Sequence, residues 1–387
     1  MKLAILGPVD VQRLFRDCNL RAVLPGQKSL GSENHQRTDI VLALRGLVEH
    51  LDVVTFDPNV RSPEEYFGDA LRLAVLPIRS RPRVRVRDAY RYERSQIEQQ
   101  LSAWQPDYIT ARQTYEYALG SLDYSRDSVV TVHDWSPAVF RHSSTPFRAA
   151  RVLTQGVCLA RGRHFGAVSP YIRSKIQRFT KNPVSLTPNG LASHWFDRTD
   201  VERVPGRVLA VNNDFSPWKN VDTLLRAWPI VQESQPQTVL WLAGGGYQEG
   251  GAAHSWAKSR GLLKGVNFVG TIPRSDLPAA FQSSTLFVHP SREEAFSMVV
   301  LEAMASGTPT VAGRDAGAVP WLLQKGGGAL VDVDDPEALA EGIVQALRHP
   351  EELAAYRRIA YERARREFTS DAAAKRIVES LAAIDED

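Results

Sequence analysis

Two glutamates separated by seven residues, Glu294 and Glu302, can bind a ligand through their carboxylates. A strand is predicted to end shortly before them, near His289, and a helix is predicted over residues 297–306. The first N–H groups of such a helix have no partner within the helix. With Ser297 as the N-cap, they suit an anionic group such as a phosphate.

Glu302 is predicted to be buried, because apolar or small residues surround it on every side of the helix. A buried carboxylate needs hydrogen-bond donors, since desolvating it without a partner costs several kcal/mol. The hydroxyls of a ribose and a buried arginine are alternative donors, and the helix pattern is compatible with both.

Two basic side chains, Lys219 and His133, are in segments that follow other predicted strands. Lys219 immediately precedes a predicted helix, where its charge and the helix start together suit a pyrophosphate. His133 follows the apolar strand 128–132, at the carboxyl end where α/β sheets place ligands. A lone histidine is more often structural, but this position favours a role in a site.

Glycines mark two further segments. The strand that begins at Val239 runs into three glycines, with Gly245 in the middle, and these allow close approach of the backbone. A glycine triplet after a strand is weak evidence by itself, because dinucleotide sites share it. Residues 7–37 are predicted to be a long connection that contains Gly31, where an ordinary turn and a ligand loop are equally compatible with the sequence.

Taken together, these runs resemble the retaining glycosyltransferases of family four, which have the GT-B fold and a Glu-x7-Glu signature. Besides Glu294 and Glu302, the resemblance includes Pro290-Ser291 and the runs 132–134, 166–172 and 187–191, so it covers most of the chain. It implies an α/β structure of two Rossmann-like domains whose parallel sheets face an interdomain cleft.

The resemblance also assigns roles to individual residues. It implies three catalytic residues: His133, Lys219 and Glu294. It implies eight residues in donor binding: Gly31, Gly245, Thr271, Ile272, Phe296, Ser297, Met298 and Glu302. The donor substrate would be a nucleotide diphosphate sugar, with no cofactor and no catalytic metal ion.

The chain departs from the family pattern just before Lys219. The family has a glycine and an arginine where this sequence has Asn213 and Asp214. One of two cations expected at the phosphates is therefore missing, which puts donor affinity, donor identity and activity in question.

The length of 387 residues predicts two domains of about 190 residues each. We assign residues 1–197 to an acceptor-binding domain and 198–369 to a nucleotide-sugar-binding domain. By the resemblance, a C-terminal helix in residues 370–387 crosses back to the first domain.

The first residues run straight into a predicted core strand, so no signal peptide is expected. No window approaches the roughly 20 apolar residues of a membrane-spanning helix. Two cysteines, Cys18 and Cys158, are too few for a disulfide framework or a metal site and fit a reducing compartment. We therefore expect a cytoplasmic protein, peripheral on the inner membrane face if it binds a membrane.

Charge is unevenly distributed. Residues 1–197 contain 27 Lys and Arg against 19 Asp and Glu, a net +8, and the remainder has 20 against 25, a net −5. Seven arginines lie in the stretch from Arg79 to Arg94, where Val84 and Val86 alternate with arginine and predict an edge strand. The stretch is either a solvated face or a contact for anionic lipid headgroups or a phosphorylated acceptor. Nucleic acid is disfavoured, because no aromatic residue interleaves with the arginines before Tyr90.

The sequence thus predicts a retaining, metal-independent glycosyltransferase. It would move a hexose-like sugar to a glycan or lipid-linked acceptor in cell-surface polysaccharide or lipopolysaccharide synthesis. The alternatives are a non-catalytic nucleotide-sugar-binding subunit, for which Asp214 argues, and a nucleotide-sugar epimerase of similar fold. An NAD-dependent oxidoreductase is disfavoured, because Gly7-Pro8-Val9 after the first strand is no Gly-x-Gly-x-x-Gly.

Overall fold

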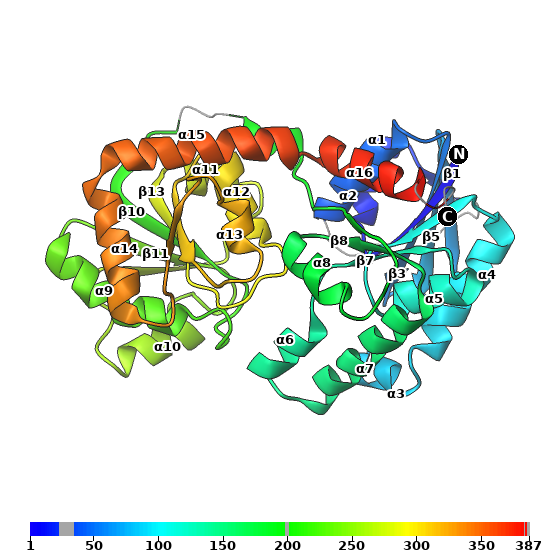
Figure 1. Cartoon of the computed structure of the whole chain (residues 1–387), viewed down its shortest axis with the longest axis horizontal. Coiled ribbons are helices and arrows are strands. Elements are labelled where there is room, and N and C mark those ends of the chain that lie inside the picture. Colours follow the sequence, from blue (N-terminus) through cyan, green and yellow to red (C-terminus); the bar gives the residue numbers. More distant parts are fainter. Residues whose placement is uncertain (23–34, 198–200, 383, 385–387) are drawn as a thin grey trace. The chain divides into compact units, whose positions relative to one another are not determined.

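The computed structural model describes residues 1–22, 35–197, 201–382 and 384 (Figure 1). The chain divides into two compact units, a first unit of residues 1–190 and 370–387 and a second unit of residues 191–369. This division lies seven residues before the boundary expected from the sequence. Among the residues that the structure describes, no helix is long and apolar enough to cross a membrane.

The first unit is built on a nine-stranded sheet in the order β2-β4-β5-β3-β1-β6-β7-β8-β9. The strands are β1 (Lys2–Leu6), β2 (Arg21–Ala22), β3 (His50–Asp57), β4 (Glu64–Gly68), β5 (Leu71–Pro77), β6 (Tyr108–Ala111), β7 (Val129–Val132), β8 (His164–Ala167) and β9 (Val184–Leu186). The pairings of β4 are antiparallel and the others are parallel. Strand β7 is buried throughout, as is typical of a parallel strand covered on both faces.

Nine helices of the first unit are described: α1 (Val11–Cys18), α2 (His35–Arg45), α3 (Pro82–Arg87), α4 (Arg91–Trp104), α5 (Glu116–Tyr124), α6 (Ser136–His142), α7 (Pro146–Arg161), α8 (Pro170–Ile176) and α16 (Ser370–Ala382). Helix α16 contacts α2 and buries Ala373, Ala374, Ile377 and Leu381 in the core of this unit. The prediction of one long connection over residues 7–37 is wrong, because α1 lies within it. The Asp10 side chain caps α1 by accepting a hydrogen bond from the Arg13 N–H.

The predicted edge strand around Val84 and Val86 is also wrong. Both residues lie on α3, which begins at Pro82 after the extended residue Arg81. Proline at the first position of a helix has the required φ and lacks an N–H that would need a partner. No residue of α3 is buried, so the alternation of arginine and valine did not reflect the two faces of a strand.

The second unit has a six-stranded, all-parallel sheet in the order β12-β11-β10-β13-β14-β15. The strands are β10 (Val204–Val211), β11 (Val239–Ala243), β12 (Val266–Gly270), β13 (Ser284–His289), β14 (Thr310–Gly313) and β15 (Ala329–Val331). The helices are η1 (Ser193–Phe196), α9 (Val221–Ser234), α10 (Ala252–Lys258), α11 (Leu277–Gln282), α12 (Met298–Ala305), α13 (Val319–Leu322), α14 (Pro336–Arg348) and α15 (Pro350–Glu367).

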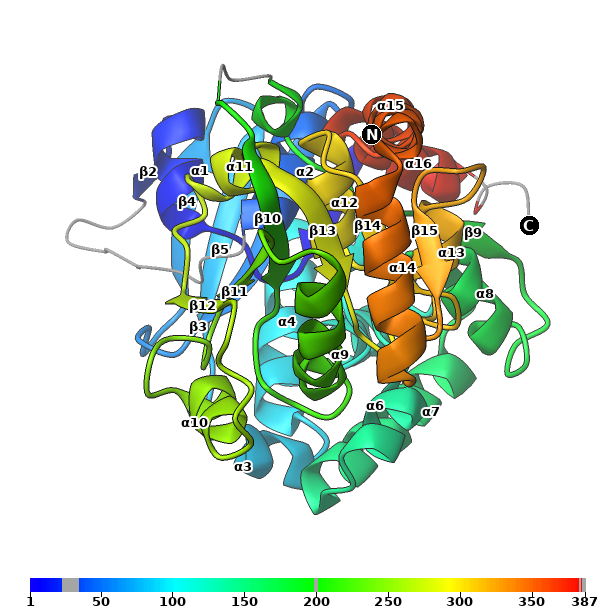
Figure 2. The ribbon, with the colours of Figure 1, turned by 90° about the vertical axis from the view of Figure 1, so that its left-hand side faces the viewer.

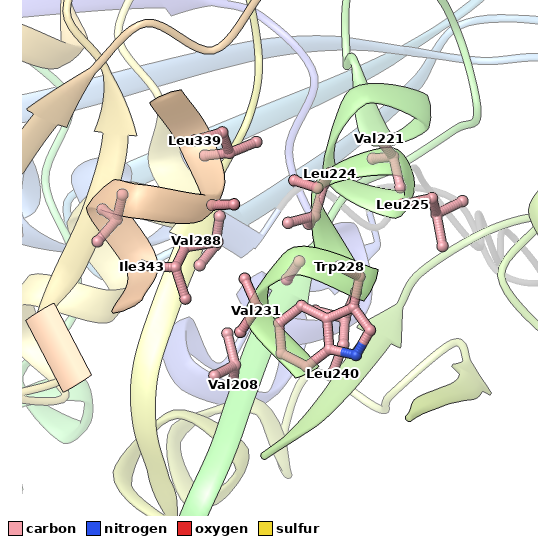
Figure 3. Close-up of a cluster of buried hydrophobic side chains, with 14 of the residues drawn as sticks. Val208, Val221, Leu224, Leu225, Trp228, Val231, Leu240, Val288, Leu339 and Ile343 are labelled. Carbon is pink, nitrogen blue, oxygen red and sulfur yellow. The ribbon is translucent and has the colours of Figure 1, made fainter. Parts of the chain in front are cut away.

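Helices α9 and α14 lie side by side on one face of this sheet (Figure 2). Figure 3 shows the core that they share with the strands, where Leu224 and Trp228 of α9 face Val208 of β10 and Ile343 comes from α14. The Trp228 indole N–H donates to the Gly265 carbonyl at 2.9 Å, so its one polar group is satisfied. This core fixes the strands whose carboxyl ends carry the residues described next.

Candidate functional site

The loops that follow β10, β11, β12 and β13 meet at one edge of the second sheet, because all its strands run in the same direction. They contain Lys219, Gly245, Thr271 and Glu294, in that strand order. The carboxyl edge of a parallel sheet is where α/β proteins bind ligands.

Asn220 fixes the position of Lys219. It is fully buried, and its amide nitrogen donates to the carbonyls of Pro290 at 3.0 Å and Val333 at 2.6 Å. Its amide oxygen accepts from the Thr223 hydroxyl at 2.6 Å. One side chain thus ties the loop after β10 to the loops after β13 and β15.

Lys219, Glu294 and His289 form a charged cluster. The Lys219 Nζ lies 2.7 Å from Glu294 Oε1, and the His289 Nε2 lies 3.3 Å from the same oxygen. Burial would raise the pKa of Glu294, but the charge of Lys219 and the hydrogen bond from His289 lower this pKa to about 2. Glu294 is therefore ionised at neutral pH, and Lys219 has a negative partner.

The backbone at Glu294 is held by the loop after β14. The Glu294 carbonyl accepts a hydrogen bond of 2.8 Å from the Ala318 N–H. Gly317 makes this approach possible, because its φ is +58° and a Cβ at this position would lie 2.3 Å from the Glu294 carbonyl oxygen. Gly317 is thus a positioning residue that the sequence did not reveal.

His289 was also missed as a site residue. Its side chain is fully buried, and its ring stacks on Phe287 with centroids 6.0 Å apart. The signal was present, since His289 ends an apolar strand and His133 directly follows one.

Ser297 does not cap α12 with its side chain, so that prediction is wrong. It occupies the N-cap position but has φ +74° and ψ +87°, a left-handed conformation that non-glycine residues seldom adopt. Its hydroxyl lies 3.3 Å from the His289 Nε2 instead. The start of α12 therefore has no side-chain cap from Ser297, and Met298 is the first helical residue.

Glu302 lies on α12 and is 5% exposed. Arg274, from the loop after β12, has its Nη1 3.2 Å from Glu302 Oε1, so the structure supplies an arginine partner, although a half-buried one, in place of the buried arginine that was weighed against a ribose. Burial raises the pKa of Glu302 to about 7 even though Arg274 acts to lower it.

Arg274 itself is half-buried and lies over the Trp195 ring, with its guanidinium carbon 5.3 Å from the ring centroid. Its second nitrogen, Nη2, is buried and has no hydrogen-bond partner among the described residues. Arg274 and Glu302 are 28 residues apart, so no local pattern indicated this pair.

The glycines after β11 are required by the protein's own backbone. Gly244 has φ +124°, and a Cβ there would lie 1.7 Å from the Asn212 carbonyl oxygen. A Cβ on Gly245 would lie 2.9 Å from the carbonyl oxygen of Asn213. These contacts explain both glycines without a ligand.

The other predicted donor-binding residues differ in exposure. Thr271 is exposed and Ile272 is half-buried, just after β12. Phe296 is buried against Trp321 and Phe368, so its side chain belongs to the core. Gly31 lies outside the described residues.

Asp214 lies at the position of the expected arginine, and it stabilises the loop after β10 through hydrogen bonds. Its carboxylate accepts from the Ser216 N–H at 3.1 Å, and its carbonyl accepts from the Tyr247 hydroxyl. A second cation, Arg292, lies close to the loop that carries Lys219. Its guanidinium pairs with Asp334 at 2.5 Å and donates to the Pro217 carbonyl.

Asp332 and Asp334 form an Asp-x-Asp sequence, a spacing that can hold a metal ion. Here Asp332 pairs with Arg314 at 3.0 Å and also accepts from the Asp334 N–H. Asp334 in turn pairs with Arg292. The described part of the chain has no group of three or more His, Cys, Asp or Glu side chains placed to bind a metal.

His133 belongs to the first unit, whereas Lys219, Glu294 and Glu302 belong to the second. It is half-buried and directly follows β7. The next residue, Asp134, accepts from the Tyr115 hydroxyl at 2.9 Å and pairs with Arg151 at 3.1 Å. The Arg151 guanidinium also lies over the Tyr115 ring, 3.9 Å from its centroid.

Residues 198–363 match the family model described as Glycosyl transferases group 1. A relative from Mycolicibacterium smegmatis, the GDP-mannose-dependent alpha-(1-6)-phosphatidylinositol monomannoside mannosyltransferase, is 35% identical over 147 residues, which are 36% of this chain and 38% of the relative. Mannosylfructose-phosphate synthase from Agrobacterium fabrum is 31% identical over 171 residues, 42% of this chain and 38% of the relative. The chain thus spans about two fifths of the length of these relatives.

Solved structures match over nearly the whole chain. Sucrose-phosphate synthase from Thermosynechococcus elongatus is 20% identical, covers 99% of both chains and has a TM-score of 0.76. The Anabaena protein HepE in complex with UDP and glucose is 18% identical and has a TM-score of 0.69. The match covers 99% of this chain and 100% of HepE. WaaG, a glycosyltransferase involved in lipopolysaccharide biosynthesis, has a TM-score of 0.66 at 16% identity, with 98% of both chains covered. The predicted α/β fold of the GT-B type is confirmed.

Proposed function

Because this chain belongs to the group 1 glycosyltransferases through residues 198–363, we propose that it moves a hexose-like sugar from a nucleotide diphosphate sugar to a glycan or lipid-linked acceptor, with retention. The observation that carries the proposal is the contact of Lys219 with Glu294, 2.7 Å apart at the carboxyl edge of the second sheet. A preorganised cation and an ionised carboxylate on adjacent loops suit a donor that has both phosphates and sugar hydroxyls.

In this proposal the second unit holds the donor. Lys219 and the backbone N–H groups at the start of α12 would bind the diphosphate, since no side-chain cap from Ser297 occupies them. Glu302 would accept hydrogen bonds from the ribose hydroxyls, with Arg274 beside it. Glu294 would orient the sugar hydroxyls, and the backbone at Thr271 would lie at the base.

The reaction breaks the bond between the sugar's anomeric carbon and the phosphate oxygen and forms a bond from that carbon to an acceptor oxygen on the same face. The acceptor's proton passes to the leaving phosphate oxygen, so no enzymatic nucleophile is required. Lys219 would stabilise the negative charge that grows on the diphosphate, as preorganised groups do in other transferases. His133 would be a further catalytic residue, as the family resemblance implies, and no metal ion would take part.

The acceptor is proposed to be anionic. The first 197 residues have a net charge of +8, which favours an acidic partner. The Mycolicibacterium smegmatis relative is named for a phosphatidylinositol monomannoside, and WaaG for lipopolysaccharide biosynthesis. We therefore propose that the enzyme acts in cell-surface polysaccharide or lipopolysaccharide synthesis, in the cytoplasm or at the inner face of the membrane.

The first experiment is a thermal-shift screen with nucleoside diphosphates and their sugars, because a ligand at about 100 times its dissociation constant stabilises a protein by about 2.7 kcal/mol. The donor found in this way is then tested for transfer with wild type and Lys219→Ala. Loss of a preorganised cation should lower kcat/KM by roughly 100-fold or more. A variant with the wild-type rate would refute the assignment of Lys219 to the diphosphate.

Asp214 favours a second candidate, a non-catalytic subunit that binds nucleotide sugar, since it replaces one phosphate-binding cation with an acid. A donor that binds with a clear thermal shift, yet is neither transferred nor hydrolysed with any acceptor tried, would support this candidate. Turnover by the wild-type protein would exclude it.

A further inference from the structure

A groove lies between α3 and the start of α7 in the first unit. It consists of two overlapping cavities of about 540 Å³ and about 640 Å³, both lined by Arg83, Arg87, Thr145 and Phe147. Each volume is within the range of small-molecule sites, about 300 to 1,000 Å³.

The arginines of this region fall into two classes. Arg79 pairs with Asp88 and Glu93, and Arg94 pairs with Asp123, so these two hold the structure together. Arg83 and Arg87 are exposed and form no ion pair with any residue in the described parts of the chain. Four residues apart on a helix, they project from the same side and present two cations to one ligand.

The wall opposite the arginines is apolar. Phe147 and Ala150 of α7 line the cavity, and the same side of the helix continues with Leu153 and Val157 at spacings of three and four residues. Leu153 is 72% exposed and Val157 is 47% exposed, so the described residues leave much of both side chains uncovered. An apolar stripe that begins at a pair of cations suits a molecule with an anionic head and a hydrocarbon chain.

The groove is at the edge of the first sheet where His133 lies. Helix α3 follows the carboxyl end of β5, and α6 and α7 follow the carboxyl end of β7. Arg151, next to Ala150 on α7, pairs with Asp134, which adjoins His133. One helix therefore links the groove to the histidine assigned to the reaction.

We propose that this groove binds the acceptor, and that the acceptor is a phosphorylated amphiphile. Its phosphate is held by Arg83 and Arg87, and its hydrocarbon chain lies along Phe147, Leu153 and Val157. The inference rests on the proposed glycosyltransferase function and names the acceptor class for it.

The test measures binding of a soluble probe, 1,2-dihexanoyl phosphatidic acid below its critical micelle concentration, to the full-length protein by calorimetry. Arg83→Ala/Arg87→Ala should weaken binding by about tenfold or more, since a hydrogen bond to a charged group contributes about 1.5 to 3 kcal/mol. Leu153→Ser/Val157→Ser should weaken binding of the same probe. It should leave the binding of inorganic phosphate, which is much weaker, unchanged.

Arg126→Ala is the matched control. Arg126 is an exposed arginine of the same unit and donates to the Arg161 carbonyl at 3.3 Å, at the other end of α7. Arg126→Ala removes one positive charge, half of what the double arginine variant removes, without touching the groove, and should bind the probe like wild type. Equal loss in this variant would show that overall charge is responsible and would overturn the site.

Two other results would overturn the proposal. One is probe binding that the double arginine variant leaves intact. The other is a dimer in analytical ultracentrifugation that Leu153→Ser/Val157→Ser dissociates without changing probe binding, because the face would then be covered by a second copy. Nucleoside diphosphate binding is measured on the same samples. If the wild-type protein binds no nucleoside diphosphate, the proposed function is refuted. If the arginine variant binds both the nucleoside diphosphate and the probe as wild type does, only the groove is refuted.

Discussion

Donor binding should depend on pH through Glu302. Burial raises the pKa of this carboxyl to about 7, with the opposing charge of Arg274 too weak to restore the ordinary value of 4.5. The ionised carboxylate accepts hydrogen bonds with both oxygens, whereas the protonated form has lost part of that capacity. A ribose diol that donates to both oxygens of Glu302 therefore requires the ionised form.

The size of the effect follows from this pKa. At a pKa of about 7, the ionised fraction is about 0.9 at pH 8 and about 0.1 at pH 6. Because the apparent Kd is the intrinsic Kd divided by the competent fraction, donor affinity should fall about tenfold between pH 8 and pH 6.

The assay is isothermal titration of a nucleotide diphosphate sugar, whose substituted diphosphate has no group that titrates in this range. Glu302→Gln should bind more weakly at pH 8 and show no change down to pH 6. Arg274→Ala removes the cation that lowers the pKa, so its transition should move above that of wild type. Wild-type affinity that is flat from pH 6 to pH 8, or an equal pH dependence in Glu302→Gln, would refute the reasoning.

Three further outcomes are expected. Glu302→Gln should stabilise the ligand-free protein at pH 8 but hardly at pH 5. The pKa of Glu302 is about 7 in the folded state, above its ordinary value of 4.5, so the folded state holds an extra proton between pH 4.5 and pH 7. The wild-type protein therefore loses stability as the pH rises through this range. The cost removed at pH 8 is about 3 kcal/mol, and equal shifts in urea unfolding at both pH values would contradict it. Gly317→Ala should cost about 1 to 3 kcal/mol and displace Glu294, because the φ of Gly317 is +58° and the new Cβ would meet the Glu294 carbonyl at 2.3 Å. The control Gly156→Ala on α7 meets no atom within 4 Å and should be neutral or stabilising by up to about 1 kcal/mol, so similar losses in both variants would argue against the close approach. Excess chelator should leave the transfer rate unchanged, and a loss restored by magnesium or manganese would refute the metal-free proposal.

The sequence revealed the features that depend on neighbouring residues. Apolar runs ending in polar residues located strand β13 with His289 and strand β7 with His133 at its end. The apolar surroundings of Glu302 predicted its burial, which the structure confirms at 5% exposure. Such patterns are readable because the side-chain periods of helices and strands are fixed by the backbone.

Predictions from the local sequence were wrong where only a few residues had to distinguish the period of a helix from that of a strand. Alternating arginine and valine around Val84 has the period of a strand, yet these residues form the short helix α3. Six residues are too few for the period to decide, and Pro82 is a start signal for a helix that the alternation obscured. The cap expected of Ser297 failed for a different reason, because the loop before α12 adopts a left-handed conformation there.

By itself, the sequence determined the alternation of strands and helices in the second unit, the family resemblance and several of the residues that gather at the carboxyl edge of the second sheet. Tertiary structure alone decided their partners: Arg274 on Glu302 across 28 residues, Lys219 on Glu294 across 75, and Gly317 beneath the Glu294 carbonyl. The physical reason is that charge pairing and close packing act through space. The pKa of Glu294 near 2 depends on the distant Lys219 together with His289, and the pKa of Glu302 near 7 is the result of burial opposed by the distant Arg274.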